Sequence, residues 1–144
     1  MNRWTVRPEA DDDAAAIGVA TVSAFTTSRH GYQGEAELVQ RLRDAGDLAL
    51  SLVVEADGVI GHVAFSPVTI SDGSCGWLGL APLSVMPEWQ GRGIGAALVA
   101  AGLARLKEQG ANGCVVLGDP GYYGRFGFRH DPALAYSGPP ARLF

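Results

Sequence analysis

The stretch Leu83–Leu98, LSVMPEWQGRGIGAAL, decides the fold of this chain. A short apolar strand stops at Pro87, a turn dense in glycine follows, and an alanine-rich helix opens directly after the turn. The first N–H groups of a helix have no intrahelical partner and carry partial positive charge, so this arrangement favours an anion such as phosphate. The stretch therefore predicts a strand, turn and helix that together hold a phosphorylated small molecule.

The turn itself supports a phosphate site. Gly91, Gly93 and Gly95 carry no Cβ, so the backbone can approach phosphate oxygens and adopt conformations closed to other residues. Arg92 adds a positive charge and a planar guanidinium suited to phosphate. Taken alone, Arg92 is equally well explained as a solvated side chain.

Composition and length restrict the class of protein. With 144 residues, 47% of them hydrophobic and 18% charged, the chain predicts one globular domain. No apolar stretch is long enough to cross a bilayer and the N-terminus lacks the apolar core of a signal peptide, which predicts a cytoplasmic protein without a membrane partner. A net charge of −4 argues against nucleic-acid binding. Cys75 and Cys114 show no ligand spacing, so neither a metal site nor a disulfide is predicted.

Hydrophobic patterning on both sides of the stretch predicts alternating strands and helices. Strands are expected at Trp4–Arg7, Leu48–Glu55, Val59–Val68, Trp77–Val85 and Cys114–Leu117. Helices are expected after the capping acids Asp11–Asp13, around Leu38–Ala45, from Gly91 to Gln109 and over Pro120–Arg125. The Asp57-Gly58 turn predicts an antiparallel hairpin, and the crossover through the glycine-led helix predicts a parallel βαβ unit.

Two segments together resemble the GNAT superfamily of acyl-CoA-dependent N-acyltransferases. Val85–Leu98 fits the family pattern V-x-P-x-x-(Q/R)-G-x-G-(I/L)-G-x-x-L, and GYYGRFGF at Gly121–Phe128 is similar to its aromatic-Tyr-x-x-x-Gly-Phe signature. The order of elements agrees over nearly the whole chain. The resemblance implies one acyl-CoA N-acyltransferase domain over residues 1–144, of α/β (α+β) class, with a mixed, mostly antiparallel sheet of about six strands flanked by helices.

The C-terminus departs from the family pattern. Only Ala133–Tyr136 is available for the last strand, which is therefore expected to be short or missing. A homodimer partner could complete the substrate side of the pocket.

The resemblance implies N-acetylation of a small-molecule or peptide amine, with acetyl-CoA as acyl donor. The glycine turn would bind the pyrophosphate, and the main chain of Leu83 and Val85 would bind the pantetheine arm. The Val85 N–H is a candidate donor to the developing oxyanion, and Tyr123 is the candidate general acid for the leaving thiolate. The predicted cofactor-binding residues are Leu83, Ser84, Val85, Gln90, Gly91, Arg92, Gly93, Ile94, Gly95, Ala96 and Tyr123.

No general base follows from the resemblance, because Trp77–Val85, where many members carry a glutamate, contains no acid. The candidates are Glu35 and Glu37 at the start of the second helix, His62 on a hairpin strand, or a water chain. Of these, His62 has a side chain that ordinarily titrates in the useful range. Each also has an ordinary structural explanation, as first-turn helix acids and as a hydrogen-bonded strand histidine.

Two other functions stay open. Gly91-x-Gly93-x-x-Ala96 also satisfies the dinucleotide fingerprint, with Asp119 as the ribose-binding acid, which would indicate an NAD(P)-binding oxidoreductase. That fingerprint normally follows its strand immediately, whereas Pro87, Glu88 and Trp89 intervene here. The absent glutamate and the short C-terminus are also compatible with a non-catalytic acyl-CoA sensor or interaction module.

Overall fold

The computed structural model describes residues 3–28, 31–69 and 76–116, together with Tyr123, Phe126 and Phe128. Its strands form one sheet in chain order. They are β1 (Thr5–Pro8), β2 (Leu50–Glu55), β3 (Val59–Pro67), β4 (Trp77–Val85) and β5 (Gly113–Val116). The first four pair antiparallel, and β5 pairs parallel to β4. The predicted mostly antiparallel sheet and the parallel βαβ unit are therefore confirmed.

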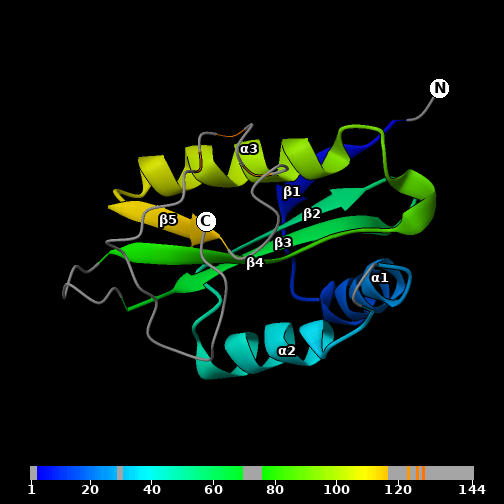
Figure 1. Cartoon of the computed structure of the whole chain (residues 1–144), viewed down its shortest axis with the longest axis horizontal. Coiled ribbons are helices and arrows are strands. Elements are labelled where there is room, and N and C mark those ends of the chain that lie inside the picture. Colours follow the sequence, from blue (N-terminus) through cyan, green and yellow to red (C-terminus); the bar gives the residue numbers. More distant parts are fainter. Residues whose placement is uncertain are drawn as a thin grey trace.

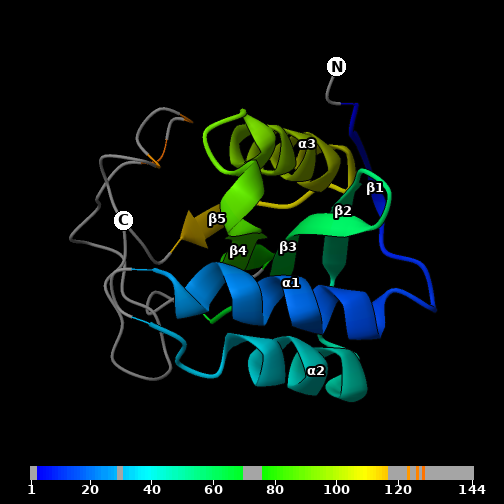
Figure 2. The ribbon, with the colours of Figure 1, turned by 90° about the vertical axis from the view of Figure 1, so that its right-hand side faces the viewer.

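Helices cover both faces of this sheet (Figure 1). The helix α3 (Ile94–Glu108) lies on one face, and α1 (Ala14–Thr26) and α2 (Glu35–Ala45) lie on the other, as Figure 2 shows. Because side chains alternate along a strand, each face has its own core. Leu52, Val63, Phe65, Leu80 and Leu98 belong to the larger core beneath α3, and Val53 packs with Ile17 and Val39 on the opposite face. Among the helices of the described residues, none has the length and apolar character of a membrane span.

The strand β4 pairs with two neighbours at its start and with one at its end, and this positions the site. Its first half pairs with β5, whose last residue, Val116, lies opposite Leu80. A bulge then places Ala81 and Pro82 opposite the single residue Ala64 of β3. Beyond the bulge, β4 stays paired with β3 but has passed the end of β5. The last residues of β4 thus have one edge that β5 does not occupy.

One of the acids expected at the start of the first helix is its N-cap residue, but its side chain makes a different contact. Asp13 stands at the N-cap of α1, but its carboxylate makes no capping hydrogen bond. It accepts instead from the Ala10 N–H at 2.6 Å and from two guanidinium nitrogens of Arg7 at 2.7 and 3.1 Å. The ion pair with β1 occupies both carboxylate oxygens, so Asp13 ties the helix start to the sheet rather than capping it.

Other boundaries differ from the prediction by a few residues. The third helix begins at Ile94 rather than Gly91, because Gly91 and Gly93 have φ of +78° and +82°, outside the helical region. The second strand begins at Leu50 rather than Leu48. The helix expected over Pro120–Arg125 and the strand expected at Ala133–Tyr136 fall outside the described residues, except that Tyr123 itself is helical.

Close approach of α3 to the sheet depends on Gly102. An added Cβ at this position would lie 2.4 Å from two ring carbons of Phe65, which is fully buried. We therefore expect Gly102→Ala to lower the free energy of unfolding by about 1–3 kcal/mol, although alanine favours helix. Chemical denaturation measures this. The control is Gly18→Ala in α1, where a Cβ meets no atom within 4 Å and stability should not fall. A Gly102→Ala variant as stable as the parent would contradict this packing.

Candidate functional site

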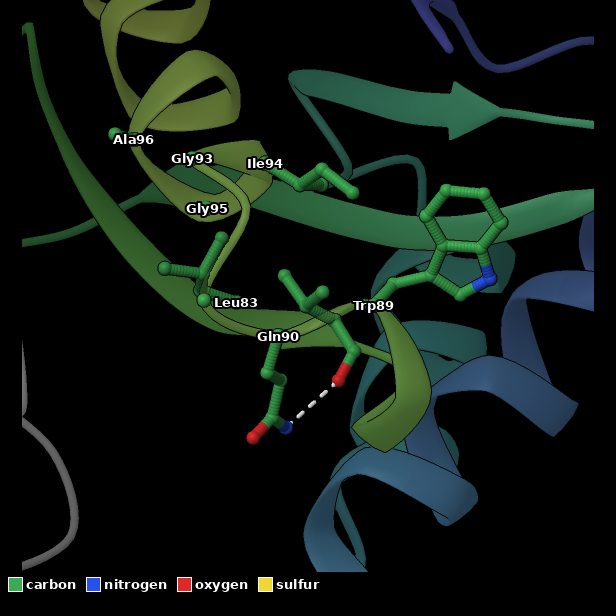
Figure 3. A pocket seen from close by; sticks show the side chains of 9 residues that line it. Leu83, Trp89, Gln90, Gly93, Ile94, Gly95 and Ala96 are labelled. Atoms are coloured by element: carbon green, nitrogen blue, oxygen red, sulfur yellow. Dashed lines mark hydrogen bonds between the residues drawn. The ribbon is translucent and has the colours of Figure 1, made fainter. Parts of the chain in front are cut away.

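A pocket of about 470 Å³ lies where β4 ends and α3 begins. Its walls come from the end of β4, the connecting turn and the first turn of α3 (Figure 3). They are Leu83, Val85, Trp89, Gln90, Gly91, Gly93, Ile94, Gly95 and Ala96. Eight of these nine residues belong to the predicted cofactor set, and Trp89 is the addition. The structure thus brings most of the predicted binding residues to one cavity.

The glycine turn places the start of α3 at this pocket. A short 3-10 helix, η1 (Pro87–Trp89), leads into the turn, and Gly93 is the N-cap of α3. The first α-helical hydrogen bond runs from the Ala97 N–H to the Gly93 carbonyl at 3.0 Å. The N–H groups of Ile94, Gly95 and Ala96 precede it and have no carbonyl within the helix to bind. They are available to an anion, as the sequence predicts.

The main chain of β4 exposes two further sets of polar groups. The Met86 N–H donates to the Ile60 carbonyl at 2.9 Å. Antiparallel ladders alternate between pairs that exchange hydrogen bonds and pairs that do not, so Val85 and Leu83 stand in pairs of the second kind. Their N–H and C=O groups point away from β3, toward the edge beyond the end of β5. An amide-bearing chain could add to this edge by backbone hydrogen bonds.

Gln90 connects two walls of the pocket by a hydrogen bond. Its side-chain amide donates to the Val85 carbonyl at 3.0 Å, the dashed line in Figure 3. This bond links the turn back to β4 and leaves the Val85 N–H as the outward donor of that residue. Gln90 therefore lies in the predicted place, with its amide already engaged by the protein.

Arg92 and Trp89 form a pair at the rim. The Arg92 guanidinium carbon lies 4.9 Å from the centre of the Trp89 ring, a cation–π contact. Arg92 is exposed and does not line the pocket, whereas Trp89 does. Trp89 is absent from the residues predicted from the sequence, although an aromatic residue two positions before a glycine turn is a signal that could identify it.

Besides Arg92, two predicted residues lie away from the pocket walls. Ser84 points to the face that α1 and α2 cover, because side chains alternate along β4, and it is 1% exposed. Tyr123 is 9% exposed and belongs to the core beneath α3, where its ring meets that of Phe128 edge to face at 6.0 Å between centroids. The structure thus places Tyr123 in the core and does not bring it to the pocket lining.

Comparison with known proteins identifies this arrangement. The model of the acetyltransferase (GNAT) domain family matches residues 47–130. The chain is 42% identical over 125 residues to YhbS of Escherichia coli, an uncharacterized N-acetyltransferase, with 85% of this chain and 72% of YhbS covered. The chain belongs to the GNAT acetyltransferase family. The prediction of an acyltransferase is confirmed, and a doubly wound dinucleotide-binding sheet is excluded.

Two solved structures extend the likeness to the whole fold. A GNAT acetyltransferase from Brucella melitensis, solved in complex with acetyl-CoA, is 46% identical with a TM-score of 0.86, covering 99% of this chain and 96% of that one. The structure of YhbS in complex with CoA has a TM-score of 0.78 at 40% identity, covering 90% and 70%. The element order expected of a GNAT acetyltransferase is thus shared along nearly the full chain.

The acids at the start of α2 are engaged in local hydrogen bonds. The Glu35 carboxylate accepts from the Gln33 N–H at 2.8 Å, and Glu37 accepts from the Tyr32 hydroxyl. The hydrogen bond from Tyr32 lowers the pKa of Glu37, which makes this carboxylate a weaker base. Neither acid lines the pocket at the β4–α3 junction, so neither gains support as the general base of this acetyltransferase.

His62 lies on β3, fully buried on the face covered by α1 and α2. Burial lowers its pKa from 6.5 to about 4, so the ring is neutral at pH 7. The expectation that it titrates in the useful range is therefore wrong, because an imidazole without access to water resists protonation. Its Nε2 lies 2.7 Å from the Ser51 hydroxyl oxygen.

The pKa of His62 makes stability depend on pH. His62 binds a proton near pH 6.5 in the unfolded chain and only near pH 4 in the folded chain. Its contribution to the free energy of unfolding is therefore fully present above pH 6.5 and is lost as the pH falls from 6.5 to about 4. We expect the free energy of unfolding to fall by about 2–3 kcal/mol between pH 7 and pH 4.5 through this group. Urea titrations across this range measure it, with His62→Gln as the control that should flatten the dependence. An equal slope in both proteins would contradict the assignment.

Proposed function

We propose that this GNAT acetyltransferase transfers the acetyl group of acetyl-CoA to a primary amine of a small molecule or peptide, by direct attack of the amine on the thioester. The observation that carries the proposal is the pocket at the β4–α3 junction, which combines free helix N–H groups with an outward-facing strand edge. The likeness to a structure that contains acetyl-CoA, at 46% identity, supports the same donor here. Because the described strands form one sheet, we assign this activity to a single domain over residues 1–144.

Different described residues suit different parts of acetyl-CoA. The N–H groups from Gly91 to Ala96 would bind the pyrophosphate, with the Arg92 charge at the rim. The outward N–H and C=O groups of Leu83, together with the Val85 carbonyl, would bind the amide groups of the pantetheine arm. The thioester carbonyl would then lie beside the Val85 N–H, which donates to the negative charge that develops on its oxygen. Ser84 would contribute main-chain atoms only.

The reaction needs three proton transfers. An alkylammonium with a pKa near 10.4 must lose a proton before attack, which costs roughly 4–5 kcal/mol at pH 7. The free amine then attacks the thioester carbon, its nitrogen gives up a second proton as the C–S bond breaks, and the thiolate takes a proton, for which we propose Tyr123 as donor. Because Tyr123 is packed in the core in this structure, this role requires its hydroxyl to reach the sulfur when the pocket is filled. The group that accepts the amine proton stays unassigned.

An amine screen tests the proposal. The protein is incubated with acetyl-CoA and with small amines, amino acids, aminoglycosides or peptides, and free thiol and the mass of the acetylated product are both measured. We expect thiol release that requires both the protein and a particular amine. Tight acetyl-CoA binding with no acetylated product from any amine would favour the non-catalytic sensor. The cytoplasmic location and the homodimer stay predictions.

A further inference from the structure

A chain of partly buried polar groups runs from α2 to the fully buried His62 on the sheet. Arg43 on α2 donates to both carboxylate oxygens of Glu9, from Nε at 3.0 Å and from Nη2 at 2.8 Å. The Ser51 hydroxyl on β2 donates to Glu9 Oε1 at 2.7 Å, and the Ser51 oxygen lies 2.7 Å from His62 Nε2. Burial alone would raise the pKa of Glu9, but the hydrogen bonds from Arg43 and Ser51 outweigh it and hold that pKa below its ordinary value. Glu9 is therefore an ionised acceptor.

The direction of these bonds sets the tautomer of His62. An ionised carboxylate only accepts hydrogen bonds, so the single hydroxyl hydrogen of Ser51 is directed to Glu9. The short contact between Ser51 and His62 must then be a donation from the Nε2–H of the ring to the Ser51 oxygen. A neutral imidazole protonated at Nε2 has a lone pair at Nδ1. His62 thus presents a hydrogen-bond acceptor on its other side.

That acceptor lacks a partner, and so does a hydroxyl on the next strand. His62 Nδ1 and Ser84 Oγ are the buried side-chain polar atoms without a hydrogen bond within the described part of the chain. The two residues are directly opposite in the β3–β4 ladder, so their side chains leave the sheet on the same face. The lone pair on His62 Nδ1 is an acceptor, and the hydroxyl hydrogen of Ser84 is a donor. The two strands thus place a complementary acceptor and donor at neighbouring positions.

Ser84 lies in the middle of the strand segment that forms one wall of the pocket, between Leu83 and Val85. We propose that His62 is a positioning residue, whose Nδ1 and the Ser84 hydroxyl are linked through one buried water, and that this link fixes the main chain of Leu83 and Val85 for the acetyl donor. The benefit to donor binding rests on the proposed function. The polar chain from Arg43 to Ser51 holds the ring in the tautomer that this contact requires.

Two isosteric variants separate the two sides of the ring. In His62→Asn the amide oxygen stands near the place of Nδ1 and keeps an acceptor for Ser84, whereas in His62→Gln the amide nitrogen stands near the place of Nε2 and keeps only the donor to Ser51. By calorimetric titration with acetyl-CoA, we expect His62→Gln to bind about five- to tenfold more weakly than the parent, and His62→Asn to lose less. A residue that only fills space predicts the reverse, because glutamine is closer to histidine in volume. Equal or stronger binding by His62→Gln than by His62→Asn would overturn the proposal.

A second measurement does not depend on the donor. In protein labelled with ¹⁵N in its three histidines, the ring nitrogens of His62 are assigned by their loss in His62→Asn and compared with those of Ser84→Ala at pH 7. We expect an Nε2–H tautomer in both proteins and a displaced Nδ1 resonance in Ser84→Ala. An Nδ1–H tautomer, or an Nδ1 resonance unchanged by Ser84→Ala, would overturn the proposal. Failure of the parent protein to bind acetyl-CoA would instead count against the proposed function alone.

Discussion

Gly93→Asp is expected to weaken acetyl-CoA binding by at least about 100-fold. Gly93 is the N-cap of α3, with φ +82°, and an added Cβ meets no atom within 4 Å. Aspartate tolerates this backbone conformation better than most residues and is a favoured N-cap, so the protein should still fold. Its carboxylate, however, would stand where the pyrophosphate is proposed to bind. Like charges brought together in a binding site cost several kcal/mol, which corresponds to the expected loss.

The matched control for this charge effect is Gly93→Asn. Asparagine has nearly the same shape, also tolerates positive φ and carries no charge. Calorimetric titration with acetyl-CoA should show a much smaller loss for Gly93→Asn than for Gly93→Asp, and raised ionic strength should narrow the difference. If both variants bind alike, the pyrophosphate is not held at this helix start.

Tyr123→Phe is expected to lower turnover at least about tenfold, within the usual range for an acid–base group, while the variant still binds acetyl-CoA. The substitution removes only the hydroxyl. A phenylalanine ring can keep the edge-to-face contact with Phe128, so a loss of activity would report on the proton and not on packing. The rate of thiol release with the amine identified in the screen measures the effect.

Tyr123→Leu serves as the packing control for this experiment. It loses both the hydroxyl and the contact between the rings of Tyr123 and Phe128, so it should be less stable to denaturant than Tyr123→Phe. Comparable activity of the two variants, each well below the parent, would agree with an acid role for the hydroxyl. Undiminished turnover in Tyr123→Phe would remove Tyr123 from the mechanism.

Local backbone chemistry explains why the site was predictable. Glycines that alternate before an alanine-rich helix need no distant residue to form a turn with free N–H groups, and the structure has that turn at Gly91 and Gly93. The hairpin at Asp57-Gly58 is likewise set by its own two residues, with φ of +53° and +118°. These features follow from the conformations that a few adjacent residues can adopt.

The parts that could not be predicted depend on contacts between distant segments. The sequence predicts that Asp13 caps a helix, but in the structure β1 places Arg7 within 2.7 Å of the Asp13 carboxylate. The sequence offers His62 as a candidate base, but in the structure burial lowers its pKa to about 4. The face of the sheet on which Ser84 lies cannot be predicted without the bulge at Ala81 and Pro82, because the bulge shifts the alternation of side chains along β4. In each case the tertiary neighbour changes the chemistry of the side chain.

Amide NMR tests most directly whether the pocket at the β4–α3 junction is the acetyl-CoA site. Acetyl-CoA is titrated into ¹⁵N-labelled protein, with NADH as the comparison ligand. We predict saturable shifts concentrated in the amides of Leu83–Val85 and Gly91–Ala96, and no saturable shifts with NADH. Saturable acetyl-CoA binding that leaves these amides unmoved and shifts residues elsewhere would contradict the claim.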